Sequence, residues 1–224
     1  MDTLIELQDA KIGYEWENPL FASLNFRVTR CQHVLVSGPC GVGKSALVKT
    51  LLGLLYLWDG SYYAFGRDMD NPSAPLLSFV RKKIGILPDA GILIQNLTVL
   101  QNIALPVRFG QFDSMDRVRR LLEPFLDEFR IKDLLTKYPS ELNLDQVKKI
   151  GFVRALINNP DLLILDDPFE GLDDDGVEIL WAQLAKINDE KEKTILVFSR
   201  KNMENPSLFS HRYRLDSGGM REVS

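Results

Sequence analysis

The stretch GPCGVGKS, residues 38–45, decides the fold expected for this 224-residue chain. It matches G-x-x-x-x-G-K-[ST], a glycine-rich loop whose backbone N–H groups converge on nucleotide phosphates at the start of a helix. On this pattern Lys44 reaches the β- and γ-phosphates, and the Ser45 hydroxyl ligates Mg²⁺. The predicted phosphate-binding set is completed by Gly38, Pro39, Cys40, Gly41, Val42, Gly43 and Ala46.

The sequence on either side of this loop supports the same interpretation. HVLV, residues 33–36, is typical of a short buried strand, and ALVKTLLGLLYL, residues 46–57, of a helix. Strand, glycine loop and helix is the order in which the phosphate loop occurs. The chain is therefore predicted to bind a nucleoside triphosphate.

The bulk properties narrow the class of protein. A hydrophobic content of 45% is ordinary for a globular fold, and a net charge of -4 gives no reason to expect a nucleic-acid surface. The two cysteines, Cys31 and Cys40, do not make a disulfide framework, so we expect a reducing, cytoplasmic setting. We expect no signal peptide, and the most apolar stretch, residues 46–58, contains Lys49 and is too short to span a bilayer.

The periodicity along the chain predicts one α/β domain over residues 1–224. Residues 1–36 alternate in short runs typical of antiparallel strands, and residues 98–158 have a helical pattern. Further strands are expected at 62–65, 82–88, 162–167 and 194–199, a helix at 176–188, and a terminal hairpin at 213–223. The predicted fold is a P-loop NTPase core with a mainly parallel sheet, an N-terminal antiparallel β subdomain and an inserted helical subdomain at about 90–157.

A second motif identifies a family. LLILDD, residues 162–167, ends an apolar strand in two acids, which after a phosphate loop makes Asp166 the expected Mg²⁺ carboxylate. Around it, YPSELNLDQVKKIGFVRALINNPDLLILDDPFEGLD, residues 138–173, resembles the nucleotide-binding subunit of an ABC transporter, and the similarity runs over essentially the whole chain. Residues 89–109, DAGILIQNLTVLQNIALPVRF, resemble the bacterial lipid-trafficking (Mla/Mce-type) ATPases more than other members.

This resemblance implies ligands and partners. ATP and Mg²⁺ are the expected cofactors, and Tyr14 lies where the family places an aromatic ring on the adenine. The expected partners are a membrane-spanning transporter subunit and a second ATP-binding subunit, in a homodimer or heterodimer, with no nucleic acid. The chain would then be peripheral on the cytoplasmic, inner face of the cell membrane.

The chain departs from the family at four functional positions. Asp89 stands where the family has a glutamine; Gln95, several residues further on, is a possible substitute. The signature Leu-Ser-Gly-Gly-Gln, which lies across a dimer interface in the family, is replaced by LNLDQ, with Asn143, Leu144, Asp145 and Gln146. Asp167 replaces the glutamate that polarises the attacking water, and Arg200 replaces the switch histidine.

Each departure has a chemical consequence. The Asp167 carboxylate is one methylene shorter than glutamate, and a misplacement of about 1 Å can cost about 10²-fold in rate. Arg200 can donate to a γ-phosphate but cannot accept a proton, whereas Asp89 can still ligate Mg²⁺. Asn143 can replace the signature serine as a hydrogen-bond donor. A carboxylate at Asp145, about 5 Å from a phosphate charge, would cost roughly 3 kcal/mol at an effective dielectric constant near 20.

Less specific interpretations remain open at these positions. Asp145 can be a helix N-cap, Arg200 a solvated residue after a strand, and Tyr14 an ordinary packing residue. The acid at Asp89 and the base at Arg200 would also cancel in charge, so we predict that the two side chains pair within salt-bridge or one-water reach.

Two functions follow from these observations. The first is an ATP-binding subunit of a membrane ABC transporter that binds Mg-ATP and hydrolyses it slowly to drive transport, with Asp167, Asp89 and Arg200 as catalytic residues. The alternative is a nucleotide-binding regulatory or assembly subunit with negligible hydrolysis.

Overall fold

The computed structural model describes residues 2–15, 17–108, 115–201, 203, 206–217 and 219–223, and it confirms the expected α/β fold class. The helices are α1 Lys44–Leu51, α2 Ala74–Lys82, α3 Val99–Arg108, α4 Met115–Glu128, α5 Leu144–Leu156 and α6 Asp174–Glu190. The strands are β1 Thr3–Ile12, β2 Phe21–Thr29, β3 His33–Ser37, β4 Asp59–Ala64, β5 Arg67–Asp68, β6 Ile84–Leu87, β7 Leu162–Asp166, β8 Thr194–Ser199, β9 His211–Asp216 and β10 Gly219–Glu222. Short 3₁₀ turns lie at Lys132–Leu134, Pro139–Glu141 and Pro206–Leu208.

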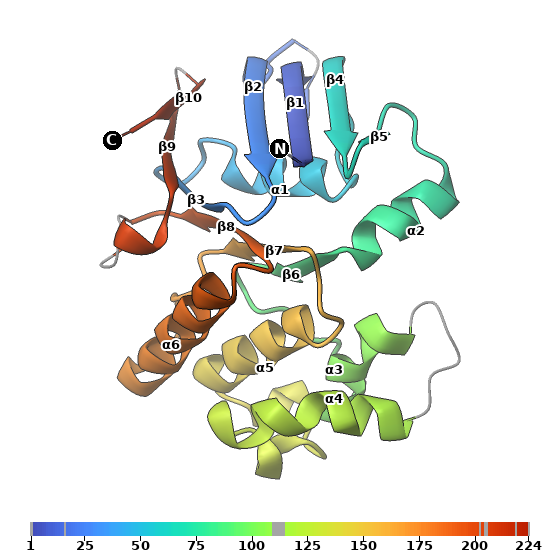
Figure 1. Ribbon diagram of the computed structural model, residues 1–224, viewed down its shortest axis with the longest axis vertical. Helices are drawn as coiled ribbons and strands as arrows, with labels where there is room; N and C mark the ends of the chain where they lie inside the picture. Colours follow the sequence, from blue (N-terminus) through green and yellow to red (C-terminus); the bar gives the residue numbers. More distant parts are fainter. Residues whose placement is uncertain are drawn as a thin grey trace.

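The central six-stranded sheet has the order β10-β9-β3-β8-β7-β6 and crosses the middle of the molecule (Figure 1). Its strands run parallel except for the β9–β10 hairpin. Ser37 pairs with Ser199 and Asp166 with Phe198, so neighbouring strands end at the same level. The segments that follow β3, β6, β7 and β8 therefore meet at one edge of the sheet, where ligands of open α/β sheets bind.

Both faces of this sheet are buried, because its strands are apolar at nearly every position. On β7 and β8, Leu163, Leu165, Ile195 and Val197 join a core with residues of α3 to α6. The alternate residues, among them Ile164 and Phe198, pack with α1 and the antiparallel strands. Continuous hydrophobic runs are the pattern expected of a parallel sheet that is covered on two sides.

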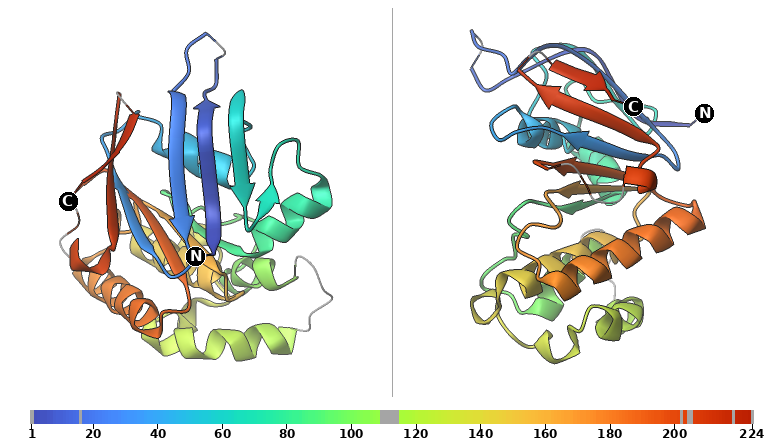
Figure 2. Two further views of the ribbon diagram at one scale, coloured as in Figure 1. Left: turned by 45° about the horizontal axis from the view of Figure 1, so that its top comes forward. Right: turned by 90° about the vertical axis from the view of Figure 1, so that its left-hand side faces the viewer.

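The N-terminal antiparallel sheet has the order β2-β1-β4-β5. It lies at the end of the molecule opposite α3 to α6, and the further views show α1 beneath it (Figures 1 and 2). Helices α3, α4 and α5 come between β6 and β7 in the chain, and Ile103, Phe129 and Phe152 are fully buried in the core that they share with the sheet. Residues 109–114, part of the predicted helical insertion, lie outside the described residues.

Two local predictions are corrected. The helix after the phosphate loop ends at Leu51 rather than at residue 57, because Gly53 takes a left-handed conformation (φ 63°) that stops it. Residues 82 and 83 were expected in a strand, but α2 runs through Lys82 and β6 begins at Ile84. Among the described residues, no helix is both long enough and apolar enough to cross a bilayer.

Candidate functional site

The loop between β3 and α1 has the backbone conformation that its glycines permit. Gly41 (φ 82°) and Gly43 (φ 102°) are both left-handed, and α1 begins immediately after Gly43. A Cβ atom at Gly43 would lie 2.6 Å from the Phe21 ring, so only glycine fits there. The loop is thus folded back at the start of a helix, where backbone N–H groups favour an anion.

The two reactive side chains of the motif point in different directions. Lys44 is buried, and its Nζ donates to the Gly38 carbonyl at 2.6 Å and to the Pro39 carbonyl at 2.8 Å. The Ser45 hydroxyl donates to the Asp166 Oδ2 at 3.5 Å. Ser45 and Asp166 therefore meet across the α1–β7 contact, as the Mg²⁺ prediction requires.

Asp166 lies at the end of β7 and is only 6% exposed. Burial, then repulsion from Asp167 and Asp89, raises its pKa from 3.8 to about 6, against the opposing effect of Lys44 and Lys148. A hydroxyl beside a carboxylate short of positive charge is a donor set that suits a hard cation such as Mg²⁺. The residues present fit the predicted metal.

A cavity of about 270 Å³ collects most of the predicted site. Of the predicted residues it is lined by Tyr14, Cys40, Gly41, Gly43, Lys44, Ser45, Ala46, Asp89, Asp167 and Arg200, together with Leu20, which was not predicted. Gly38, Pro39 and Val42 belong to the loop but do not line the cavity, and neither does Gln95. Between the two candidates for the missing glutamine, the structure therefore favours Asp89.

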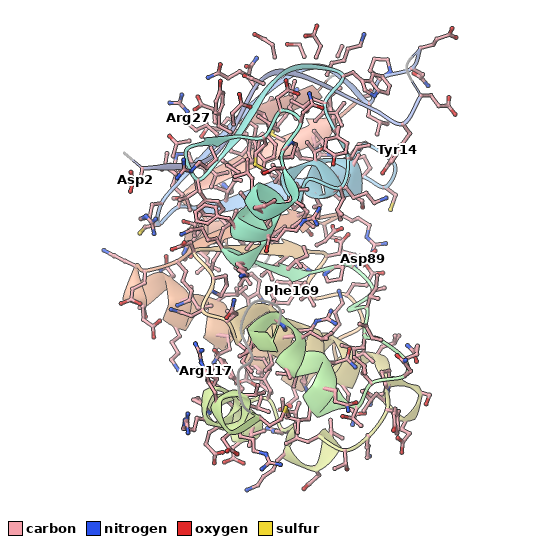
Figure 3. All side chains as sticks on the ribbon, turned by 90° about the vertical axis from the view of Figure 1, so that its right-hand side faces the viewer. Asp2, Tyr14, Arg27, Asp89, Arg117 and Phe169 are labelled. Atoms are coloured by element: carbon pink, nitrogen blue, oxygen red, sulfur yellow. The ribbon has the colours of Figure 1, made fainter. Side chains whose placement is uncertain are left out.

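Tyr14 is 60% exposed, which argues against ordinary packing in the core. Lys49 on α1 donates from its Nζ to the Tyr14 hydroxyl at 3.1 Å and lies 5.2 Å from the ring centroid. Tyr14 and Asp89 lie on the same side of the molecule, with Tyr14 nearer the antiparallel sheet (Figure 3). The ring is open to a planar ligand at the rim of the phosphate-loop cavity.

Arg200 forms hydrogen bonds or ion pairs with three acids at the site. Its backbone N–H donates to Asp167 Oδ1 at 2.8 Å, and its Nε donates to Asp167 Oδ2 at 2.8 Å. Its Nη2 pairs with Asp89 Oδ1 at 3.4 Å and also with Glu170. The predicted Asp89–Arg200 pair is confirmed, and the interpretation of Arg200 as a solvated residue is wrong.

The three acids around Arg200 form one cluster. A carboxylate oxygen of each of Asp89, Asp167 and Glu170 lies within 4.8 Å of the other two. Burial works against the charged guanidinium, but Asp167, Cys40 and Asp89 outweigh it and raise the pKa of Arg200. No sequence pattern points to Glu170, because its approach to Arg200 depends on the reversal of the chain after Asp167.

The altered signature forms the start of α5. Asn143 is the N-cap: its Oδ1 accepts from the Gln146 N–H at 2.8 Å, and the Gln146 side chain accepts from the Asn143 N–H at 3.1 Å. The interpretation of Asp145 as the N-cap is therefore wrong. The reciprocal pair is a capping box, which the spacing of Asn143 and Gln146 could have revealed. Leu144 is 71% exposed beside this cap.

Asp145 points inward instead of outward. It is 9% exposed, and its Oδ2 pairs with the Nζ of Lys149 at 2.8 Å. Lys149 also lies 3.9 Å from Asp173 and 3.7 Å from Asp175 at the start of α6. Because Lys149 neutralises the carboxylate, the repulsion expected between Asp145 and a phosphate is largely removed.

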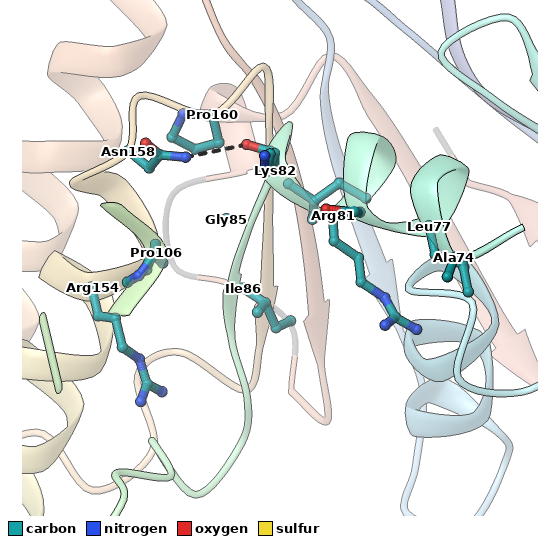
Figure 4. A pocket seen from close by; sticks show the side chains of 13 residues that line it. Ala74, Leu77, Arg81, Lys82, Gly85, Ile86, Pro106, Arg154, Asn158 and Pro160 are labelled. Atoms are coloured by element: carbon teal, nitrogen blue, oxygen red, sulfur yellow. Dashed lines mark hydrogen bonds between the residues drawn. The ribbon is translucent and has the colours of Figure 1, made fainter. Parts of the chain in front are cut away.

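A second cavity, of about 440 Å³, lies between α2, β6 and α5 and contains none of the predicted site residues. Its wall includes Leu77 and Arg81 from α2, Ile86 from β6, Pro106 from α3 and Arg154 from α5 (Figure 4). Arg154 donates to the Ile92 carbonyl at 2.6 Å, which ties α5 to the segment after β6.

Comparisons with known proteins agree with this geometry. The model of the ABC transporter family matches residues 21–170. The intermembrane phospholipid transport system ATP-binding protein MlaF of Haemophilus influenzae is 26% identical over 87% of this chain and 74% of its own length. The methionine import ATP-binding protein MetN of Latilactobacillus sakei is 29% identical over 88% of this chain and 58% of its own. The dimeric structure of a bacterial ABC transporter cassette superposes with a TM-score of 0.89 at 25% identity, covering 99% of this chain and 98% of that one.

Proposed function

This chain belongs to the ABC transporter family, and from that premise we propose that it is an ATP-binding subunit that binds Mg-ATP and hydrolyses it slowly. The observation that carries the proposal is the arrangement, at the carboxyl ends of the parallel strands, of an intact phosphate loop, a hydrogen-bonded Ser45–Asp166 pair and an acid, Asp167, held by Arg200. The first two features bind nucleotide, and the third limits turnover.

The binding residues act as follows. The loop amides and Lys44, after leaving the Gly38 and Pro39 carbonyls, hold the phosphates, while Tyr14 supports the adenine. Ser45 and Asp166 would hold Mg²⁺, with Asp89 as a further carboxylate nearby. When bound, the metal would supply positive charge that neutralises the phosphates.

Slow turnover follows from the position of Asp167. To orient a water, this carboxylate needs a free oxygen toward the γ-phosphate, yet its Oδ1 accepts from the Arg200 N–H and its Oδ2 from the Arg200 Nε. Rotation of the Arg200 side chain toward the γ-phosphate would release Asp167 Oδ2 for a water, while Oδ1 would keep its bond to the backbone N–H. That rotation also breaks the contacts of Arg200 with Asp89 and Glu170.

The same observation favours a second candidate function. If Arg200 remains on Asp167 when ATP is bound, the chain is a regulatory or assembly subunit that holds ATP with negligible hydrolysis. Turnover separates the two candidates.

The test is the steady-state ATPase rate of the purified chain and of the Asp167→Glu/Arg200→His variant. We expect the wild type to be at least about tenfold slower than the variant, which regains the longer carboxylate and a neutral base. Lys44→Ala, the control, should lose most Mg-ATP affinity by calorimetry. A wild-type rate of several per second, or no gain in the double variant, would contradict slow hydrolysis; unchanged affinity in Lys44→Ala would contradict the binding site.

We also propose the partners and the location. A second ATP-binding subunit would present its altered signature to this phosphate loop, with Asn143 and Leu144 facing across the interface and Asp145 and Gln146 turned into their own subunit. A membrane-spanning subunit would dock at the second cavity. The wall of this cavity joins α2 and the outer strand β6 to α3 and α5. The chain would then be peripheral, on the cytoplasmic face of the cell membrane. Crosslinking from a cysteine placed at Ser78 tests the docking site.

A further inference from the structure

Lys148 is a buried cation that neither the phosphate loop nor the signature accounts for. It lies on α5 and is 4% exposed. Its Nζ donates to the backbone carbonyl of Asp167 at 2.8 Å. A buried ammonium needs a partner of this kind, because an unpaired one is strongly destabilising.

The carbonyl that Lys148 holds belongs to an unusual peptide. Asp167 has a left-handed backbone (φ 44°), which costs free energy in a residue other than glycine unless the surroundings fix it. Its N–H donates to the Phe198 carbonyl at 2.9 Å, and the Glu170 N–H donates to its carbonyl at 3.2 Å. Lys148 is the side chain that completes this set on the carbonyl.

The charges around the ammonium fit the same role. Burial lowers the pKa of Lys148, while Asp89, Asp167 and Asp166 raise it and Arg200 lowers it further. Lys148 and Arg200 therefore bond different groups of Asp167: Lys148 bonds its backbone carbonyl, and Arg200 bonds its carboxylate.

We propose that Lys148 is a positioning residue that fixes the Asp167 peptide and thereby aims the Asp167 carboxylate at the phosphate-loop cavity. It acts through the hydrogen bond to the carbonyl and does not touch the nucleotide. The inference rests on the proposed function for its catalytic consequence, but its geometric claim can be tested without turnover.

The chain offers a reporter for that claim. Phe169, two residues after Asp167, stacks on Trp181 of α6 with ring centroids 4.4 Å apart and planes at 27°. In a Trp16→Phe/Trp58→Phe background Trp181 is the single tryptophan, since the chain has three. Loosening of the turn after Asp167 should separate the rings and expose Trp181 to a quencher such as acrylamide.

Two variants separate the hydrogen bond from the charge. Lys148→Met and Lys148→Gln are both one atom shorter than lysine; Met lacks a donor, whereas Gln keeps an N–H donor without a charge. We expect Lys148→Met to raise the acrylamide quenching constant about twofold, and Lys148→Gln to stay close to wild type. In the turnover assay Lys148→Met should lower kcat about tenfold with the Kd for Mg-ATP unchanged. Lys186→Met, the same change at an exposed position on α6, is the control.

The outcomes are distinct. An unchanged quenching constant in folded Lys148→Met would overturn the proposal. Equal increases in the quenching constants of Lys148→Met and Lys148→Gln would also overturn it, because they would assign the effect to the charge. If Lys148→Met does not fold, Lys148→Leu, which also lacks a donor, takes its place. A wild type without turnover would refute the hydrolysis proposed above, and the quenching comparison would still decide the role of Lys148.

Discussion

Replacing Asp166 by asparagine removes the carboxylate whose proton affinity the site raises most clearly. Its pKa of about 6 lies about two units above the ordinary value of 3.8. Each unit corresponds to about 1.4 kcal/mol, so keeping Asp166 ionised in the folded, nucleotide-free chain costs about 3 kcal/mol. Asp166→Asn should therefore stabilise the chain at neutral pH by up to about that amount.

The pH dependence gives the effect a sign that can be checked. Because the pKa is raised in the folded state, the protonated carboxyl's contribution to stability is fully present below about pH 4 and is lost as the pH rises through about 6. The difference in free energy of unfolding between Asp166→Asn and wild type should grow over this interval and then level off. Urea denaturation at a series of pH values measures it.

A second aspartate provides a control of opposite sign. For Asp161, burial alone would raise the pKa, but hydrogen bonds from Lys83 and Arg30 outweigh it and lower the pKa. Asp161→Asn should therefore destabilise the chain at neutral pH, with the loss shrinking as the pH falls through the lowered pKa. Two results would show that the folded chain does not raise the pKa of Asp166: Asp166→Asn less stable than wild type at pH 7 without nucleotide, or a stability difference that does not vary with pH.

Three further predictions concern the charged groups and the cap. Arg200→Gln should leave the surrounding acids to repel one another, so adding Asp89→Asn should recover stability, with a coupling of about 1 kcal/mol in a double-mutant cycle; additive losses would exclude a working pair. Asn143→Ala should cost about 1 kcal/mol in thermal or urea unfolding and Asn143→Asp little, whereas an equal loss in both would deny the cap its role. Lys149→Met should cost about 3 kcal/mol by leaving Asp145 buried and unpaired, and Lys149→Met/Asp145→Asn should regain part of it; no recovery would show that packing, not charge, is lost.

Two kinds of feature in the site could be predicted: those set by a short sequence motif, and those set by the order of the strands in the sheet. The phosphate loop is a short motif between a strand and a helix, so its conformation follows from nearby residues. The Asp89–Arg200 pair could be predicted because the two residues follow β6 and β8, the strands on either side of β7 in one parallel sheet, and their charges cancel. The fold class followed from strand and helix periodicity in the same way.

The contacts that could not be predicted depend on backbone reversal or on burial. Glu170 reaches Arg200 because the chain reverses at Asp167, which has a left-handed backbone. An aspartate at this position does not by itself predict a left-handed turn. Lys148 reads as a surface residue until α5 is placed against the end of β7. The Asp145–Lys149 pair was different: its i,i+4 spacing on a helix was visible in the sequence and was missed.

The buried Asp145–Lys149 pair also bears on the evolutionary history open to this chain. A mutation of Asp145 to the family's glycine would leave the Lys149 ammonium buried, with Asp173 and Asp175 at 3.9 and 3.7 Å as its remaining partners. A mutation of Lys149 alone would strand the carboxylate instead. We expect either single change to lower stability, so a stepwise path to the family's signature passes through a less stable intermediate. The ion pairs of Lys149 thus link the altered signature to the stability of the fold, independently of ATP turnover.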